Sequence, residues 1–238
     1  MFVYSLMSAD QSPGFSRHGQ KLELILRTAA RIFAEKGYHS TSMREISRGT
    51  EVSLAGLYHY CRSKEELLFL IQDHCFGRLV ERLEERLRAE HDAIERIRIV
   101  IDNHLSFFAA NMAEMKVLSH EADSLRGEMQ ERVSRRKRDY TRLVRRILSD
   151  ARRLEGASTQ RASDDLTVET YALFGMMNWI YNWYNPRGKL SVNELVDSIT
   201  RLFLIGFLTN RNDVTFAVPS STARENVNMW RASGRPAS

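Results

Sequence analysis

Hydroxyl and cationic side chains near the start of the chain have the spacing needed to bind a phosphate. Ser40, Thr41 and Ser42 lie directly before a short run with the apolar pattern of a helix. Arg44 follows within its first turn. The first N–H groups of a helix have no intrahelical partner, so together with the helix dipole they attract an anion. Hydroxyl groups and a cation at such an end are typical of contacts to a nucleic-acid backbone.

A second short helical run follows after a tight connection, and Ser53 opens it. Val52, Leu57 and Tyr60 have the phase to pack against neighbouring helices. The outward positions are Leu54, Ala55, Gly56, Tyr58 and His59. Two short helices joined by a tight turn predict a helix-turn-helix, whose second helix enters the major groove of DNA while the first crosses the backbone. The small side chains at 55 and 56 would allow close approach, and Lys64 would supply a point charge to a phosphate.

Each of these residues has an ordinary structural interpretation when it is taken alone. A single Arg44, Tyr58 or His59 in a helix is more often a surface or packing residue than a DNA contact. The charge of the chain supports the functional interpretation, because residues 17–64 hold nine Lys or Arg and four Glu, a net charge of +5. A compact basic module favours a polyanion such as double-stranded DNA as its partner.

The elements that must position these side chains are helices. The chain has 238 residues with only 12 Gly and 4 Pro, and it has no alternation of apolar and polar residues that would indicate a strand. We therefore predict an all-α fold. Capping boxes, in which a Ser hydroxyl and a Glu carboxylate satisfy backbone N–H groups, mark helix starts at Ser42, Ser63 and Ser191. The predicted helices span residues 20–36, 43–49, 53–60, 64–89, 93–110, 115–122, 128–154, 166–184 and 192–208, with a loop at 155–163.

Composition excludes several classes of protein. A hydrophobic fraction of 43% and a charged fraction of 27% are typical of a globular chain. The most apolar candidate for a membrane span, residues 171–184, is interrupted by Asn178 and Asn182. The start MFVYSLM lacks a positive region and is too short for a signal-peptide core, and Met7 is an alternative start. Two cysteines cannot form a disulfide framework. We therefore expect a cytoplasmic protein with no membrane partner.

The run AARIFAEKGYHSTSMREISRGTEVSLAGLYHYCRSKEELL resembles the N-terminal signature of the tetracycline-repressor (TetR) family of transcriptional regulators. The resemblance covers about residues 17–78. It implies an all-helical homodimer in which each subunit has a three-helix DNA-binding domain and a larger ligand-binding and dimerising domain. Three positions depart from the family pattern: Glu51 stands where Gly is usual, Cys61 replaces an aromatic residue, and Leu54 replaces a frequently polar or basic one. Glu51 is therefore expected to accept a strained turn conformation.

Carried onto this chain, the resemblance implies contacts to each half of a palindromic operator. The residues expected at the DNA backbone are Thr41, Ser42, Tyr58 and Lys64. The residues expected to face the groove are Arg44, Ser53, Leu54, Ala55, Gly56 and His59. The implied organisation is a flexible segment 1–17, a helix-turn-helix domain 18–78, a helical ligand-binding and dimerisation domain 79–211, and a disordered tail 212–238. The helices 166–184 and 192–208 are expected to pack against their symmetry mates.

The larger domain holds three segments similar to those of family members that respond to acyl-CoA thioesters in fatty-acid, steroid or aromatic-acid catabolism. These segments are residues 104–108, 120–123 and 173–184. The implied function is a repressor of such catabolism, or of efflux, that a small hydrophobic or acyl-CoA effector releases from DNA. The candidate ligand-binding residues are Phe107, Phe108, Met112, Arg136, Tyr140, Asn178, Trp179 and Trp183. The alternative for each aromatic residue is simple core, and Asn178 and Asn182 either bond across helices or receive a polar ligand atom.

The helix predicted over residues 128–154 carries a second basic region, with ten Lys or Arg and four acidic residues. At about 100° per residue, its apolar stripe contains Met129, Val133, Tyr140, Val144, Ile147 and Ala151. The opposite side carries Arg135, Arg138, Arg142, Arg145 and Arg146. We expect this side to be mostly solvated, with the alternative that part of it binds the phosphates of a large acidic ligand. Arg136 lies at the margin of the apolar stripe, where we expect it to face a cavity and recognise an anionic group.

An enzyme and a DNA-binding protein without an effector are the alternative classes. The sequence has none of the H-E-x-x-H, G-x-S-x-G, Gly-rich phosphate-binding or Glu-x-x-His motifs that would indicate catalysis. His91 with Asp92, and His120 with Glu121, are possible metal ligands, but they lack the four-residue spacing that puts two ligands on one helix face. We therefore expect no catalytic residue, no metal and no cofactor.

Overall fold

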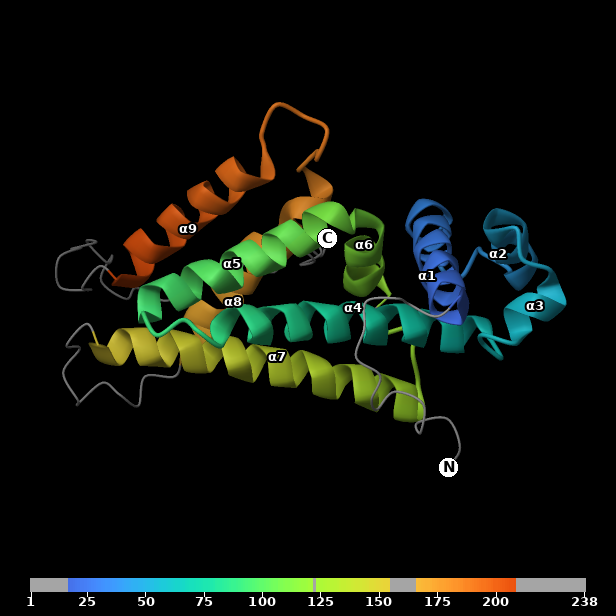
Figure 1. Cartoon of the computed structure of the whole chain (residues 1–238), viewed down its shortest axis with the longest axis horizontal. Coiled ribbons are helices and arrows are strands. Elements are labelled where there is room, and N and C mark those ends of the chain that lie inside the picture. The colour runs from blue at the N-terminus through green and yellow to red at the C-terminus, as the bar shows by residue number, and fades with distance from the viewer. Residues whose placement is uncertain (1–16, 122, 155–165, 209–238) are drawn as a thin grey trace, which may run out of the picture.

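The computed structural model describes residues 17–121, 123–154 and 166–208, and its regular elements within these ranges are helical. They form a small head and a larger body (Figure 1). The predicted all-α class, with a helix-turn-helix followed by a larger helical domain, is confirmed. The predictions of a loop at 155–163 and a tail at 212–238 lie outside the described residues, as does most of the segment 1–17. Within the described ranges, the helices are too short or too polar to cross a membrane.

The head contains three helices and the first turns of a fourth. They are α1 (Arg17–Lys36), α2 (Met43–Thr50), α3 (Leu54–Tyr58) and α4 (Lys64–Leu87). The apolar face of α1 buries Ile25, Ala29 and Phe33 against the other helices. Gly37 ends this helix with a φ of +85°, a left-handed conformation that glycine adopts without steric cost.

The body is assembled from the remaining helices. They are α5 (Ala93–Ala110), α6 (Met112–His120), α7 (Gly127–Leu154), α8 (Thr167–Asn178), the 3-10 turn η2 (Trp179–Asn182) and α9 (Val192–Leu208). α4 runs from the head through the body, where α5 and α7 pack along it, and α9 covers α5 from the outside (Figure 1). The head rests on the body at a second place, because α1 packs against α6.

α4 belongs to both parts of the molecule. Its first half buries Leu67, Leu68 and Ile71 in the head, and its second half buries Leu79 and Leu83 in the body, all at 1% exposure or less. Because each buried leucine or isoleucine stabilises the fold by about 1.5–3 kcal/mol, α4 joins head and body through one continuous core.

The helix predicted over residues 166–184 is shorter in the structure. α8 ends at Asn178, and the chain continues as the 3-10 turn η2. Pro186 disfavours the α conformation at Asn185, and the last turn before such a stop often tightens to 3-10 geometry. Two predicted starts come three residues late, because α1 begins at Arg17 and α6 begins at Met112.

Candidate nucleic-acid interface and ligand cavity

The start of α2 has the predicted capping box. Ser42 Oγ accepts a hydrogen bond from the N–H of Glu45 at 3.3 Å, and the N–H of Ser42 donates to Glu45 Oε2 at 2.8 Å. This backbone hydrogen bond, assisted by Lys36 and the Ser42 hydroxyl, lowers the pKa of Glu45 to about 2. The box fixes the helix end while Ser42 and Arg44 stay exposed.

Two of the residues expected at the DNA backbone have partners inside the head. Thr41 is 3% exposed, and its hydroxyl donates to the carbonyl oxygen of Gly37 at 2.8 Å. Lys64 Nζ donates to the carbonyl oxygens of Tyr38 and Thr41, each at 2.8 Å, and of His39 at 3.3 Å. Both side chains therefore hold the turn between α1 and α2, and a phosphate would have to share the ammonium group of Lys64 with these carbonyls.

The turn between α2 and α3 has the strain that the sequence predicts. Glu51 adopts a φ of 55° and a ψ of 27°, the left-handed region that a residue with a Cβ enters at a cost. Ser47 stabilises the turn, because its hydroxyl donates to the carbonyl oxygen of Val52 at 2.6 Å. The turn sets α3 against α2 at the end of the head that is farthest from the body (Figure 1).

α3 presents a small, mixed surface. Ser53 is its N-cap and accepts a hydrogen bond from the N–H of Gly56 at 3.0 Å. Leu57 is fully buried, so the opposite side of the helix faces outward. The residues expected in the groove or at the backbone are exposed at Ser53, Ala55, Tyr58 and His59 and half-buried at Leu54 and Gly56. A Cβ on Gly56 would lie 3.0 Å from both Ser53 Oγ and Val52 Cγ1, so this glycine also has an internal packing role.

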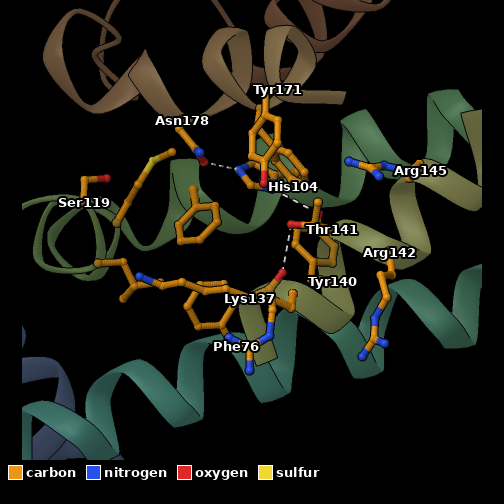
Figure 2. A pocket seen from close by; sticks show the side chains of 15 residues that line it. Phe76, His104, Ser119, Lys137, Tyr140, Thr141, Arg142, Arg145, Tyr171 and Asn178 are labelled. Carbon is orange, nitrogen blue, oxygen red and sulfur yellow. Dashed lines mark hydrogen bonds between the residues drawn. The ribbon is translucent and has the colours of Figure 1, made fainter. Parts of the chain in front are cut away.

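A cavity of about 580 Å³ opens in the body between α4, α5, α6, α7 and α8 (Figure 2). This volume is within the range of small-molecule sites. Its apolar wall contains Phe76, Phe108, Met115, Leu118, Tyr171 and Phe174. Its polar wall contains His104, Ser119, Lys137, Arg138, Tyr140, Thr141, Arg142, Arg145 and Asn178. Three predicted ligand residues, Phe108, Tyr140 and Asn178, therefore lie at the cavity.

The cationic wall of the cavity differs from the sequence expectation. Arg138, Arg142 and Arg145 were assigned to the solvated side of α7, but they line the cavity with Lys137. The apolar stripe of α7 is buried as predicted at Val133, Tyr140, Val144, Ile147 and Ala151. The cavity opens along the flank of this stripe, and long side chains reach around the helix to it. Burial lowers the pKa of Lys137 from its usual value.

The structure places the other predicted ligand residues elsewhere. Arg136 lies outside the cavity and forms a two-point ion pair with Asp73 of α4, with Nη2 3.2 Å from Oδ2, so its charge already has a partner. Phe107 lines a second cavity of about 400 Å³ between α1, α4, α5 and α6. Met112 packs at the edge of the core, and Trp179 and Trp183 are 61% and 53% exposed.

A buried polar chain crosses the body beside the cavity. The side chains of His104 and Tyr140 are 2% and 3% exposed, and His104 Nδ1 lies 3.1 Å from Tyr140 Oη. His104 Nε2 lies 3.1 Å from Asn178 Oδ1, so Asn178 does bond across helices, one of its two expected roles (Figure 2). Burial lowers the pKa of His104 to about 4, so its imidazole is neutral near pH 7. The sequence did not predict His104 as a cavity residue, although it begins the segment 104–108, which is similar to those of acyl-CoA-responsive family members.

Glu121 lies at the junction of head and body. Glu121 Oε1 accepts from the N–H of Tyr38 at 3.3 Å, and its carbonyl oxygen accepts from Gln72 Nε2 at 3.2 Å. Glu121 follows α6, whose residues Met115 and Leu118 line the cavity. One short helix therefore connects the cavity wall to the turn that Lys64 holds.

The carboxylates of the two pairs considered as metal ligands have structural partners. Asp92 caps α5 by accepting from the N–H of Glu95 at 2.7 Å, and Glu121 is engaged at the junction. Among the described residues, no group of three or more His, Cys, Asp or Glu side chains is arranged to hold a metal ion.

The head and the body of the chain each match a model of a known protein family. A family model described as "Bacterial regulatory proteins, tetR family" matches residues 25–71. A second, described as "Tetracyclin repressor-like, C-terminal domain", matches residues 90–207.

Individual relatives are similar over most of their length. The chain is 25% identical over 187 residues to the fatty acid metabolism regulator protein of Bacillus subtilis (strain 168), covering 76% of this chain and 93% of the relative. It is 26% identical over 193 residues to the HTH-type transcriptional repressor KstR2 of Mycobacterium tuberculosis, covering 80% and 92%. Among solved structures, AibR in complex with isovaleryl coenzyme A and operator DNA matches with a TM-score of 0.63 and 29% identity, over 76% of this chain and 97% of that one. A TetR-family regulator from Bordetella parapertussis 12822 matches with a TM-score of 0.69 and 28% identity, over 82% and 98%.

Proposed function

Because this chain belongs to the tetracycline-repressor (TetR) family of bacterial regulatory proteins, we propose that it is a repressor that binds a palindromic operator as a homodimer and leaves it on binding an acyl-CoA. The chain is a DNA-binding transcriptional regulator and not an enzyme. Binding to operator DNA supports a cytoplasmic location.

We assign residues 18–78 to the DNA-binding domain and residues 79–211 to the ligand-binding and dimerising domain. The two family matches fall inside these bounds, which supports the division. The proposed groove contacts are the exposed positions of α3 with Arg44, and the proposed backbone contacts are Ser42 and Tyr58. Thr41 and Lys64 would act chiefly by positioning the turn that precedes α2, with Lys64 able to share a phosphate.

The observation that supports an acyl-CoA effector is that the cavity is lined by both apolar and cationic side chains. An apolar wall suits an acyl chain, while four cations from α7 suit the phosphates of coenzyme A. Arg142 and Arg145 lie toward one side of the cavity, whereas Lys137 lies beside Phe76 of the apolar wall, with Nζ 5.8 Å from its ring centroid (Figure 2). One ligand with an apolar part and an anionic part can contact both sets. A related protein, AibR, is described in complex with isovaleryl coenzyme A, which supports the same class.

The proposed dimer interface is the outer surface of α8, η2 and α9. Large apolar side chains are exposed there in the protomer: Val168, Tyr171, Trp179, Trp183, Leu202 and Ile205. Exposed apolar side chains of this size are costly in water, and a symmetric partner would cover them.

Release of DNA would proceed through α6 and α4. α6 lines the cavity and packs on α1, and Glu121 after it binds the α1–α2 turn. An effector that fits the cavity better when α6 is displaced would favour a head orientation that no longer matches successive major grooves.

The test begins with a thermal-shift screen of acyl-CoA thioesters with short, long, aromatic and steroid acyl groups. Duplexes selected from a random DNA pool then serve as the operator, and fluorescence anisotropy measures operator affinity with and without the best ligand. The proposal predicts a stabilised melting transition and weaker operator binding with that ligand. Operator affinity that is unchanged by every bound thioester would instead indicate a DNA-binding protein without an effector.

A further inference from the structure

The polar chain through Tyr140, His104 and Asn178 has one direction of donation. The Tyr140 hydroxyl is buried, and within the described residues its hydrogen-bond partner is His104 Nδ1. If His104 donated to it, the phenol proton would be buried without an acceptor, which is unfavourable. The phenol therefore donates, and Nδ1 accepts.

This direction fixes the tautomer of His104 and the orientation of Asn178. A neutral imidazole that accepts at Nδ1 carries its proton on Nε2. Nε2–H then donates to Asn178 Oδ1 at 3.1 Å. Because Oδ1 of Asn178 is engaged, its Nδ2 group is directed away from His104. Asn178 is an exposed residue of the cavity wall, so this amide can offer its N–H donors to a ligand.

The neighbours of His104 keep the imidazole neutral and in place. Phe108, Tyr140 and Phe174 surround it, with ring centroids at 4.8, 6.0 and 6.2 Å. These groups are uncharged near pH 7, so the direction of the chain does not depend on a nearby ion pair. A rigid, neutral donor chain is suited to select a neutral acceptor rather than to bind an anion.

We propose that the Asn178 amide donates a hydrogen bond to the thioester carbonyl oxygen of the effector. His104 and Tyr140 are positioning residues that orient this amide N–H toward the oxygen. This inference rests on the proposed acyl-CoA function and identifies the feature of the ligand that is selected. In Figure 2, Arg142 and Arg145 lie toward one side of the cavity and Ser119 toward the other, with Asn178 and His104 between them. A carbonyl between an acyl chain and an anionic coenzyme fits this order.

Selection for the carbonyl arises from the difference in binding free energy between ligands with and without an acceptor at Asn178. A ligand that brings a methylene group to Asn178 displaces water from the amide and offers no acceptor, whereas a carbonyl replaces that water. One neutral hydrogen bond of this kind contributes about 1 kcal/mol, which corresponds to a five- to tenfold difference in affinity.

The test compares octanoyl-CoA with S-octyl-CoA, the thioether in which a methylene group replaces the carbonyl. Calorimetry with the full chain is expected to give wild-type protein a five- to tenfold preference for the thioester. Asn178→Asp keeps the size of the side chain and the acceptor for His104 but removes the donor, so the preference is expected to vanish. Asn178→Leu is a second variant with the same expectation, and Ser119→Ala, on the same cavity, is expected to retain the wild-type preference.

The positioning role of Tyr140 is tested by a separate variant. Tyr140→Phe removes the hydroxyl that fixes the tautomer of His104, and it is expected to reduce the thioester preference while S-octyl-CoA binds as tightly as before. If Tyr140→Phe kept the wild-type preference for the thioester, the positioning role of the Tyr140–His104 hydrogen bond would be wrong.

Several results would overturn the inference. Equal affinity of wild-type protein for octanoyl-CoA and S-octyl-CoA would remove the carbonyl from recognition while leaving acyl-CoA binding intact. If both Asn178 variants kept the wild-type preference for octanoyl-CoA over S-octyl-CoA, Asn178 would not be the residue that recognises the carbonyl. Octanoate binding as tightly as octanoyl-CoA would identify a carboxylate as the group that is read. Failure of the wild-type protein to bind either CoA compound or any thioester of the thermal-shift screen would overturn the proposed function together with this inference.

Discussion

The DNA-binding head and the ligand cavity are assembled in different ways. In the head, the side chains proposed to meet DNA come from one stretch of chain, residues 41–64, and two short helices with their caps fix their order. In the cavity, the lining comes from α4, α5, α6, α7 and α8, which are far apart in sequence. A local motif therefore specifies one surface, and tertiary packing specifies the other.

The two regions also use polar groups differently. The polar groups of the head lie at helix ends, where Ser42 and Glu45 pair in contact with water. The cavity contains a fully enclosed imidazole, His104, whose hydrogen-bond partners are both neutral. Replacement of His104 is therefore expected to change how the free energy of unfolding depends on pH. Substitutions in the head are expected to alter turn geometry and DNA affinity.

The largest expected effect is the pH dependence that His104 contributes. Its pKa is about 4 in the folded protein and 6.5 as a reference value, so between these values the unfolded chain binds a proton that the folded chain does not. Folding stability is therefore lost as pH falls from 6.5 toward 4, by about 3 kcal/mol in total. Urea unfolding at several pH values and one protein concentration should show this loss in wild-type protein and not in His104→Gln. Parallel pH profiles for the two proteins would contradict it.

The next effect separates a positioning residue of the head from a contact residue. Lys64→Ala leaves three carbonyl oxygens without their ammonium partner, and we expect it to lower the free energy of unfolding by about 2 kcal/mol. Tyr58 is 47% exposed, so Tyr58→Ala is expected to weaken operator binding about tenfold without lowering the melting temperature. Calorimetry and anisotropy together measure both quantities. Equal stability of Lys64→Ala and wild-type protein would show that the ammonium group serves DNA rather than the turn.

A smaller effect is expected from the cationic wall of the cavity. Arg142→Ala should weaken octanoyl-CoA binding about tenfold, more at low salt than at high salt, because it removes a cation from the cavity lining. Arg142 pairs with Asp139 of the same helix, but both side chains of this pair are exposed to water, so the phosphates of a ligand can compete with the carboxylate. Arg146→Ala is the matched control, since Arg146 belongs to the same helix but lines neither cavity. Calorimetric titration at two salt concentrations measures the difference. Equal losses in the two variants would indicate that the general charge of α7, and not the cavity, attracts the ligand.

The smallest expected effect lies in the turn between α2 and α3. Glu51 is held in the left-handed region, which costs a residue with a Cβ about 1 kcal/mol. Glu51→Gly removes that cost but gives the unfolded chain more freedom, so a net stabilisation below about 1 kcal/mol is expected. Thermal unfolding measures it, and a destabilised variant would show that the Glu51 side chain makes a contribution larger than the strain.

The same contrast explains how far the sequence alone predicts the molecule. The capping box at Ser42, the strained turn at Glu51 and the buried Leu57 are encoded by neighbours within a few residues, and each is found as predicted. The apolar stripe of α7 was also predicted, because burial follows the helical period. The α8 boundary at Asn178 was missed, since it depends on how the aromatic run packs before Pro186.

The cavity shows what periodicity cannot supply. A helical wheel places Arg142 and Arg145 opposite the apolar stripe, but it does not state where neighbouring helices leave an opening at the flank. Arg136 was expected at the cavity because it lies at the margin of the apolar stripe, where an arginine needs a partner or a ligand, and Asp73, 63 residues away, is that partner. The role of His104 depends on tertiary packing, because its two partners come from other helices, Tyr140 from α7 and Asn178 from α8.

The central claim is that the head and the cavity form one coupled system, and reciprocal binding tests it most directly. Operator affinity is measured with and without saturating octanoyl-CoA, and octanoyl-CoA affinity is measured with and without saturating operator, under identical salt and pH. Linkage requires the two ratios to be equal, and the account predicts that each ligand weakens the other by the same factor, of the order of 5–150-fold. Ratios of one in both directions, with both ligands bound, would contradict it.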